Sequence, residues 1–265
     1  MRASLLPLVV LSLGVSIAAQ ETPEVDPLLE AIVATDRAQH QAINDIVFDA
    51  EYIEGEERDG TLIEEERYVK RIWIKFIEDT TLYAERFIEY YKDGELQDSA
   101  RLVEKSREKH EERQKRNGRD ISWPMLRPFY PENRNQYEID YRGLDSKAVD
   151  GYVCHHFRVR ALQADPDLIN GDFYFETEAF HLARADFRPA KLVSKLMFKL
   201  KRLDMSIVYA PINEGWWLPR RFHISGHGRA ALLIGVKFAA TEFYRNPQVN
   251  TGINDTVFEN HNEQQ

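Results

Sequence analysis

The sequence predicts an α+β fold built on a large antiparallel β-sheet, and three observations indicate it. Short apolar runs follow one another from Val149 to Tyr244, with turn residues between them. In the clearest run, Leu192–Arg202, apolar residues alternate with lysines, which is typical of a strand with one buried and one hydrated face. The chain holds about ten such runs, more than a flat open sheet accommodates, so we expect the sheet to curl, pack on itself or close.

The composition indicates an acidic globular protein. A chain of 265 residues fits one large domain or two small ones, and its apolar fraction of 43% allows a sizeable core. The formal net charge of −9 argues against a nucleic-acid partner, which needs a basic surface. The single cysteine, Cys154, excludes an internal disulfide.

Residues 1–19 have the layout of a secretory signal peptide. Arg2 supplies positive charge, Leu5–Val15 is apolar, and Ser16–Ala19 offers small residues for cleavage. The alternative, a membrane anchor, needs about 20 apolar residues, and this run is shorter. No cysteine lies at the junction for lipid attachment, so we expect an exported protein with one domain over residues 20–258 and a polar tail over 259–265.

A helix is predicted from Asp26 to about Ile43, because Asp26-Pro27 is typical of a helix start and apolar residues follow at helical spacing. We expect the apolar side of this helix to pack on the sheet. Three predicted strands follow, at Ile46–Ile53, Arg67–Phe76 and Leu82–Tyr91. Trp73 lies on the charged side of its strand, where it is either covered by another element or part of a contact surface.

The segment Asp98–Arg116 is predicted to be a helix, because opposite charges recur three and four positions apart. It is either a hydrated helix without a partner, or a mobile lid or charged docking surface. The next segment, Trp123–Pro131, is apolar and rich in proline, so we expect neither a regular helix nor a central strand there. Such a loop is suited to cap the mouth of a sheet.

The second half of the chain holds the remaining predicted strands, separated by glycine-containing turns. They are Tyr137–Tyr141, Tyr152–Leu162, Asp172–Glu178, Phe180–Asp186, Leu192–Arg202, Met205–Ala210, Trp217–His227 and Ala231–Phe243. Ser225–Gly228 resembles a hydrolase nucleophile motif only superficially, and we interpret it as a tight turn. Beyond Asn246 the chain is polar, with Val257 and Phe258 able to anchor part of it.

No catalytic or metal-binding template is recognisable, so we predict that the protein is not an enzyme and uses no metal or cofactor. Cys154, His155 and His156 form a cysteine–histidine cluster. Consecutive side chains of a strand face opposite ways, so this cluster lacks the third group that a metal site or a nucleophile–base pair needs. A hydrolase of unfamiliar type is a third hypothesis, and it would need polar groups converging near His155 or His223.

A curved sheet with helices across its opening is suited to enclose an apolar cavity. Strand alternation selects the candidate ligand-binding residues Ile72, Ile74, Phe76, Phe175, Leu196, Phe198 and Leu200. The pattern leaves two interpretations equally open, a ligand cavity and a fully packed core. If the faces are assigned correctly, Phe198→Asp is expected to abolish ligand binding or folding.

Five stretches carry a resemblance to a known family: Tyr141–Leu144, Val149–Arg160, Phe173–Arg184, Gly215–Pro219 and Tyr244–Asn250. With the order of the elements, they resemble the periplasmic lipoprotein carrier LolA and its superfamily of outer-membrane lipoprotein-sorting proteins. The resemblance implies a curved, half-open antiparallel β-barrel of about ten strands. It also implies an N-terminal helix, a helical lid-like insertion and a cavity for acyl chains. The charged helix Asp98–Arg116 departs from the carriers' more apolar lid helices, which leaves lipid sensing or protein binding open.

We therefore expect a periplasmic or secreted protein, peripheral to a membrane at most, that binds a lipid or a lipidated protein as a non-catalytic carrier or sensor. Its expected partners are lipid acyl chains or a lipoprotein, with an envelope protein as a further candidate. The alternative is an envelope interaction module with a packed core. Its contacts would lie on the charged helix and at the Trp216–Trp217 edge.

Overall fold

The computed structural model describes residues 25–58, 61–77, 80–115, 124–192, 194–195, 198–212, 215–230 and 234–258. The predicted signal peptide, residues 1–19, and the polar tail, 259–265, lie outside these ranges and stay predictions. Among the described helices, none is long and apolar enough to cross a membrane.

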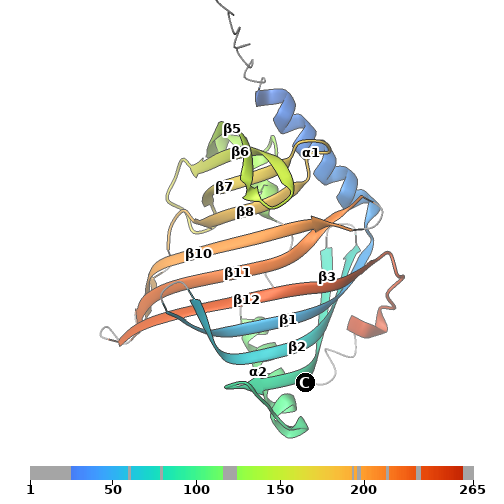
Figure 1. The fold of residues 1–265 in the computed structure, drawn as a ribbon, viewed down its shortest axis with the longest axis vertical. Helices are drawn as coiled ribbons and strands as arrows, with labels where there is room; N and C mark the ends of the chain where they lie inside the picture. The colour runs from blue at the N-terminus through green and yellow to red at the C-terminus, as the bar shows by residue number, and fades with distance from the viewer. Residues whose placement is uncertain are drawn as a thin grey trace, which may run out of the picture.

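In the part of the chain that the structure describes, twelve antiparallel strands form one curved sheet, shown in Figure 1. Eleven follow one path in the order β4-β3-β2-β1-β12-β11-β10-β8-β7-β6-β5, and β9 pairs with the start of β10. The strands are β1 Asp45–Arg58, β2 Thr61–Ile77, β3 Thr80–Lys92, β4 Glu95–Leu96, β5 Tyr137–Val149, β6 Tyr152–Ala161, β7 Ile169–Glu176, β8 Leu182–Pro189, β9 Ser194–Lys195, β10 Phe198–Pro211, β11 Trp217–Ala230 and β12 Ile234–Val249. Within the described chain the end strands β4 and β5 do not pair with each other, so the barrel is half open, as predicted.

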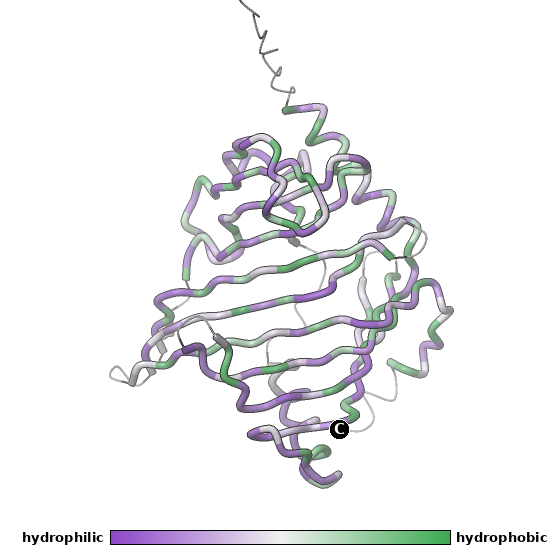
Figure 2. Tube along the Cα trace, viewed as in Figure 1, coloured by the Kyte–Doolittle hydropathy of each residue, from purple (hydrophilic) through white to green (hydrophobic). Residues whose placement is uncertain are grey.

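The alternation of polar and apolar residues explains the long strands, and Figure 2 shows it along the sheet. On β2, Ile72 and Ile74 are buried on the inner face, which we define as the face that carries the helices. Arg71, the residue before Ile72, points outward and pairs with Asp49 of β1. A slip of one residue would expose the apolar row, so the alternation fixes the register of the strand.

Helices cover the inner face. They are α1 (Val25–Ala42), α2 (Ser99–Lys115) and the short 3-10 helices η1 (Pro124–Phe129) and η2 (Arg134–Gln136). The apolar stripe of α1, from Leu28 to Val33, is buried against the sheet, as its helical spacing predicts. α2 begins after Asp98, whose carboxylate caps the helix by accepting a hydrogen bond from the Arg101 N–H at 2.9 Å.

The predicted strand Leu192–Arg202 is wrong as a single strand. Ser194–Lys195 forms β9, and the chain then reverses so that Lys195 pairs with Phe198, the first residue of β10. β10 continues through the separately predicted strand Met205–Ala210. The alternation of apolar residues and lysines persists across the reversal without a glycine or proline, so the sequence pattern hides the turn.

The start of β8 and the predicted turn Ser225–Gly228 also differ from the prediction. β8 begins at Leu182 rather than Phe180, because Phe180 has a positive φ of 64° and lies in the turn between β7 and β8. Ser225–Gly228, interpreted as a tight turn, lies inside β11. Gly226 has a packing role there, because a Cβ atom would lie 2.8 Å from the Arg202 carbonyl oxygen and 2.7 Å from the Phe238 ring.

Trp73, on the outer face, is covered by the C-terminal segment. It packs against a buried cluster that consists of Val47, Ala84, Ile253 and Phe258. The Asp45 carboxylate holds this segment by accepting hydrogen bonds from the N–H groups of Thr251 at 2.7 Å and Gly252 at 2.9 Å. The covered alternative for Trp73 is therefore confirmed, and Phe258 anchors the end of the described chain.

Candidate functional site

A small cavity lies between α1 and the inner face of the sheet, with a volume of about 50 Å³. Its walls belong to two buried clusters: Leu182 is part of the first core cluster, under α1, and Ile46 is part of the second, on β1 and β2. The lining residues are Ile32, Thr35, Asp36, Gln39, His40, Ile43, Ile46, Phe76, Leu126, Phe180, His181, Leu182, Tyr209, Trp217 and Leu218. The cavity is therefore the place where the packing of the two clusters is incomplete.

Polar side chains of α1 form the rim of this cavity and hold the helix on the sheet. The Gln39 amide donates a hydrogen bond to the Trp217 carbonyl at 3.0 Å and accepts one from the Trp217 N–H at 2.9 Å. The Thr35 hydroxyl donates to the Ala179 carbonyl at 2.7 Å. Because these contacts involve backbone groups, they fix the position of α1 in addition to its apolar stripe.

Several titratable side chains also lie at the rim of the cavity or beside it. The Tyr130 hydroxyl donates a hydrogen bond to Asp36 at 2.5 Å, and Arg37 lies 5.2 Å from the centroid of the Tyr130 ring. The hydrogen bond with Asp36 raises the pKa of His40 above its ordinary value, against the opposing effect of burial. Protonation of His40 would add a positive charge at the edge of the cavity.

Aromatic rings fill the first core cluster beside the cavity. The fully buried Phe129 of η1 packs edge-on against Phe157, Phe173 and Phe175, with centroid distances of 5.8, 5.2 and 5.0 Å. Edge-to-face contacts of this kind stabilise aromatic clusters beyond their buried area. The proline-rich segment thus caps the aromatic floor of the sheet.

Four of the predicted ligand-binding residues lie on the inner face, but not together. Ile72 and Ile74 belong to the second core cluster, and Phe76 packs against it. Phe175 is fully buried in the first core cluster. Of these four, Phe76 alone lines the cavity.

The other three predicted residues surround the β9–β10 reversal. Leu196 lies outside the described residues, and so does the side chain of Phe198. Leu200 on β10 is half-buried. Because Lys195 pairs with Phe198, the run Leu192–Arg202 is not one continuous strand, and the role expected for Leu196 stays a prediction.

The strands carry a regular feature that was not predicted from the sequence, a set of tyrosine–glutamate pairs two residues apart. In each pair the tyrosine hydroxyl donates to the carboxylate: Tyr52–Glu54, Tyr68–Glu66, Tyr83–Glu85, Tyr91–Glu89 and Tyr244–Glu242. Register places all of them except Tyr91–Glu89 on the inner face. Residues two apart on a strand share a face, so Tyr-x-Glu or Glu-x-Tyr inside an alternating strand was the available signal.

Lys70 places a buried charge among these pairs. Its Nζ lies 2.8 Å from Glu85 Oε2 and 2.7 Å from Glu242 Oε1, and the three side chains are 8%, 2% and 15% exposed. Burial lowers the pKa of Lys70, but attraction to the two carboxylates outweighs burial and raises the pKa above its ordinary value. The inner face is therefore divided into an apolar half under α1 and a polar, tyrosine-rich half.

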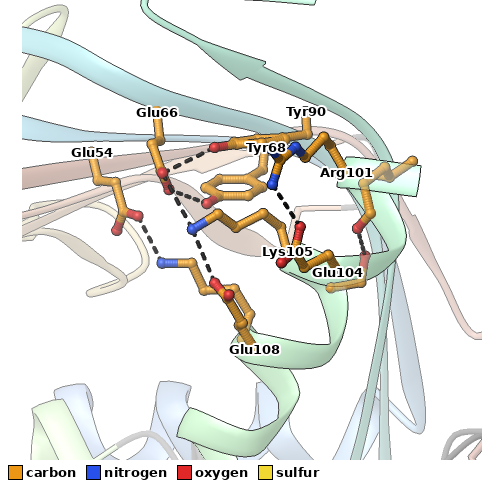
Figure 3. Close-up of polar contacts among 11 residues, drawn as sticks. Glu54, Glu66, Tyr68, Tyr90, Arg101, Glu104, Lys105 and Glu108 are labelled. Carbon is orange, nitrogen blue, oxygen red and sulfur yellow. Dashed lines mark hydrogen bonds and ion pairs between the residues drawn. The ribbon is translucent and has the colours of Figure 1, made fainter. Parts of the chain in front are cut away.

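α2 lies against the polar half and contributes two lysines to it, of which Figure 3 labels Lys105. The Nζ of Lys109 lies 2.7 Å from Glu54 Oε1. The Nζ of Lys105 lies 3.5 Å from Glu66 Oε1. α2 therefore contacts the sheet through two lysines, and the interpretations of α2 as a hydrated helix, a lid or a docking surface stay predictions.

The predicted cysteine–histidine cluster is split between the two faces of β6. His155 points inward, where its Nδ1 lies 3.0 Å from the Tyr141 hydroxyl, and His156 points outward to Asp172 at 2.7 Å. Cys154 is fully buried, and burial raises its pKa to about 11. In the described ranges, no group of three or more histidine, cysteine, aspartate or glutamate residues could hold a metal ion.

The sequence matches no protein-family model and no curated protein. Solved structures similar to it include a DUF1329-family protein from Desulfovibrio piger ATCC 29098, with 12% identity, a TM-score of 0.47, and 92% of this chain and 100% of that chain covered. Another is an outer-membrane lipoprotein-sorting protein domain from Vibrio parahaemolyticus, with 11% identity, a TM-score of 0.48 and coverages of 91% and 100%.

The LolA-superfamily protein NE2245 from Nitrosomonas europaea is also similar, with 10% identity, a TM-score of 0.34 and coverages of 89% and 98%. The structural neighbours therefore include the superfamily that the sequence resembles. At this level of identity, the neighbours assign no role to any residue of the chain.

Proposed function

We propose that the protein binds the apolar chain of a lipid or a lipidated protein between α1 and the sheet, as a non-catalytic carrier or sensor in the cell envelope. The observation that carries this proposal is the place of the cavity, at the junction of two core clusters. Its wall is apolar, with Ile32, Leu126 and Leu182, and its rim is polar, with Thr35 and Gln39. An apolar pocket with a few directed polar groups is the usual form of a small-molecule site.

The cavity must enlarge to accept such a ligand, because ligand pockets usually measure about 300–1,000 Å³ and this one measures about 50 Å³. α1 is the element whose displacement would enlarge it. An inserted apolar chain would keep the stripe of α1 and the facing sheet out of water, so little apolar burial would be lost. Phe76 would then contact the ligand first, with Ile72, Ile74 and Phe175 as deeper walls.

Fluorescent fatty-acid binding to the mature protein tests this proposal. Ile32 is 1% exposed and lines the cavity, so Ile32→Phe should fill the space. We expect its affinity to fall at least about tenfold. Gln39→Ala removes the clamp to Trp217 and should raise the affinity.

Ile88→Phe is the matched control, because Ile88 is 44% exposed on β3 and does not line the cavity. Wild-type affinity in Ile32→Phe, with its fold intact by circular dichroism, would remove the cavity from consideration as the ligand site.

An interaction module with a packed core is the second candidate, and the small volume of the cavity favours it. In that case no fatty acid binds to the wild type or to the Gln39→Ala variant. Trp217, one of the expected contacts of such a module, is 7% exposed and lines the cavity, so it is not available as a surface contact. A partner would instead meet α2.

A further inference from the structure

We propose that α2 is an internal competitor for a binding surface on the inner face, and that a lysine-bearing segment of a partner protein takes its place there. We call this surface the tyrosine–carboxylate site, and it consists of Tyr52, Glu54, Glu66, Tyr68 and Tyr90. It lies in the polar half of the inner face and does not depend on the apolar cavity under α1.

The seat of Lys109 shows why this site suits an ammonium group. The Nζ of Lys109 lies 2.7 Å from Glu54 Oε1, and 5.8 and 5.3 Å from the ring centroids of Tyr52 and Tyr68. A cation within about 6 Å of an aromatic centroid is attracted by the ring. A carboxylate adds a charge-assisted hydrogen bond. The site therefore combines two kinds of group that recognise primary ammonium.

Glu66 provides a second seat, occupied by Lys105. The hydroxyls of Tyr68 and Tyr90 both donate hydrogen bonds to the Glu66 carboxylate. Burial raises the pKa of Glu66, but the hydrogen bonds outweigh burial and hold the pKa below its ordinary value. Burial and the Glu66 carboxylate raise the pKa of Tyr90 to about 12, so this hydroxyl stays a donor. Glu66 is therefore held charged, with its oxygens fixed in place.

The described side chains of α2 reach the sheet through these polar contacts and through an edge-on contact of His110 with Phe87, with a centroid distance of 6.1 Å. Among residues 99–111, whose side chains are described, none is buried, and Val103 is 68% exposed. Lys105 is also shared with Glu108 of its own helix at 2.9 Å, one of the contacts drawn in Figure 3. Partly exposed ion pairs contribute little to stability. α2 is therefore far easier to displace than α1, whose apolar stripe is buried.

Charge complementarity identifies the occupant. The site presents two carboxylates, and each forms an ion pair with a lysine of α2. The two lysines are four positions apart, which is about one helical turn. A partner segment with two lysines at this spacing can replace both contacts. The negative net charge of the chain, −9, adds long-range attraction for such a segment.

The test uses the full mature chain with Lys105→Ser and Lys109→Ser, which empties the site. The probe is a fluorescein-labelled peptide with the sequence of residues 98–115. Its binding to the protein is measured by fluorescence anisotropy at low salt. We expect the double variant to bind the peptide at least about tenfold more tightly than the wild type, whose own lysines compete. The same peptide with glutamine at the positions of Lys105 and Lys109 should not bind.

The control tests whether the peptide binds to the two carboxylates of the site or is attracted only by the net negative charge of the protein. On the double-variant background, Glu54→Gln with Glu66→Gln should abolish binding, whereas Glu56→Gln with Glu95→Gln removes as much charge elsewhere and should preserve it. Equal affinities for the wild type and the double variant, or binding that survives the loss of Glu54 and Glu66, would overturn the proposal.

Two further measurements distinguish a partner protein from a lipid surface, and this site from the cavity under α1. Competition by phosphatidylethanolamine vesicles, which also present primary ammonium, would assign the site to a lipid surface and overturn the assignment to a partner protein. Fatty-acid binding by the lysine double variant should match that of the wild type, because the cavity under α1 is unaffected. A failure of one proposal therefore leaves the other testable.

Discussion

Replacing Lys70 by methionine would remove the ammonium group that bridges Glu85 and Glu242, while keeping a side chain of similar length. The three side chains are 8%, 2% and 15% exposed, so two carboxylates would be left poorly hydrated beside each other. Breaking a buried ion pair by removing one partner costs about 3–5 kcal/mol. The hydroxyls of Tyr83 and Tyr244 still donate hydrogen bonds to the carboxylates, at 2.9 and 2.8 Å. We therefore expect a loss of stability at the lower end of this range.

We therefore expect Lys70→Met to lower the free energy of unfolding by about 3 kcal/mol. For a domain of this size, that corresponds to a fall in Tm of about 6–12 °C. Urea unfolding followed by tryptophan fluorescence measures the first quantity, and circular dichroism on heating measures the second.

Two control variants show whether the loss of stability arises from the buried lysine and its two carboxylates. Arg58→Met removes a cation that is 66% exposed beside Glu56, and should cost less than about 0.5 kcal/mol. Lys70→Met combined with Glu85→Gln and Glu242→Gln removes all three charges and should recover most of the stability. A cost below about 1 kcal/mol for Lys70→Met alone would refute the reasoning that these carboxylates depend on Lys70.

Two further predictions concern packing and pH. Gly226→Ala should lower the free energy of unfolding by about 1–3 kcal/mol, because the added Cβ would clash with the Arg202 carbonyl oxygen. Gly235→Ala is the control and should leave the free energy of unfolding unchanged, because a Cβ there has no neighbour within 4 Å. Equal urea midpoints for the two variants would contradict this prediction. Burial lowers the pKa of His155, so its stabilising contribution is present above its unfolded pKa of about 6.5 and is lost as the pH falls through the lower folded value. His155→Gln should therefore flatten the decline of stability from about pH 7 to about pH 5, measured by urea unfolding, and an unchanged slope would argue against it.

The curved sheet was predictable because alternation is a local signal. Along β2, Ile72 and Ile74 mark the inner face, and the adjoining strands repeat the pattern. The helical stripe of α1 is equally local, so its burial on the sheet followed from the sequence. These features need only the period of the apolar residues and a few turn and cap residues.

The β9–β10 reversal could not be found in this way. Between Lys195 and Phe198 the chain changes direction, but the leucine–lysine alternation continues through the turn. Only the pairing of β10 with β11 and β8 determines where the strand begins, and such pairing joins residues far apart in the sequence. Three of the predicted site residues, Leu196, Phe198 and Leu200, were selected on that one misjudged strand.

The polar half of the inner face was missed for a different reason. Glutamates such as Glu54 and Glu66 lie in strongly charged stretches, and most charged stretches are hydrated. Their burial depends on tyrosines of the same strands and on α2, whose Lys105 and Lys109 cover them. The local sign was the spacing of tyrosine and glutamate by two residues, and its meaning depended on which face of the strand was inward.

Native mass spectrometry of the mature protein, purified from the envelope of its own host, tests the central claim that an apolar chain binds under α1. We predict a species heavier by one lipid, identified after extraction, and a large reduction of that species in Ile32→Phe. A ligand-free mass, together with no uptake of added fatty acid or lipopeptide by the wild type or by Gln39→Ala, would contradict the claim and leave the protein-interaction role.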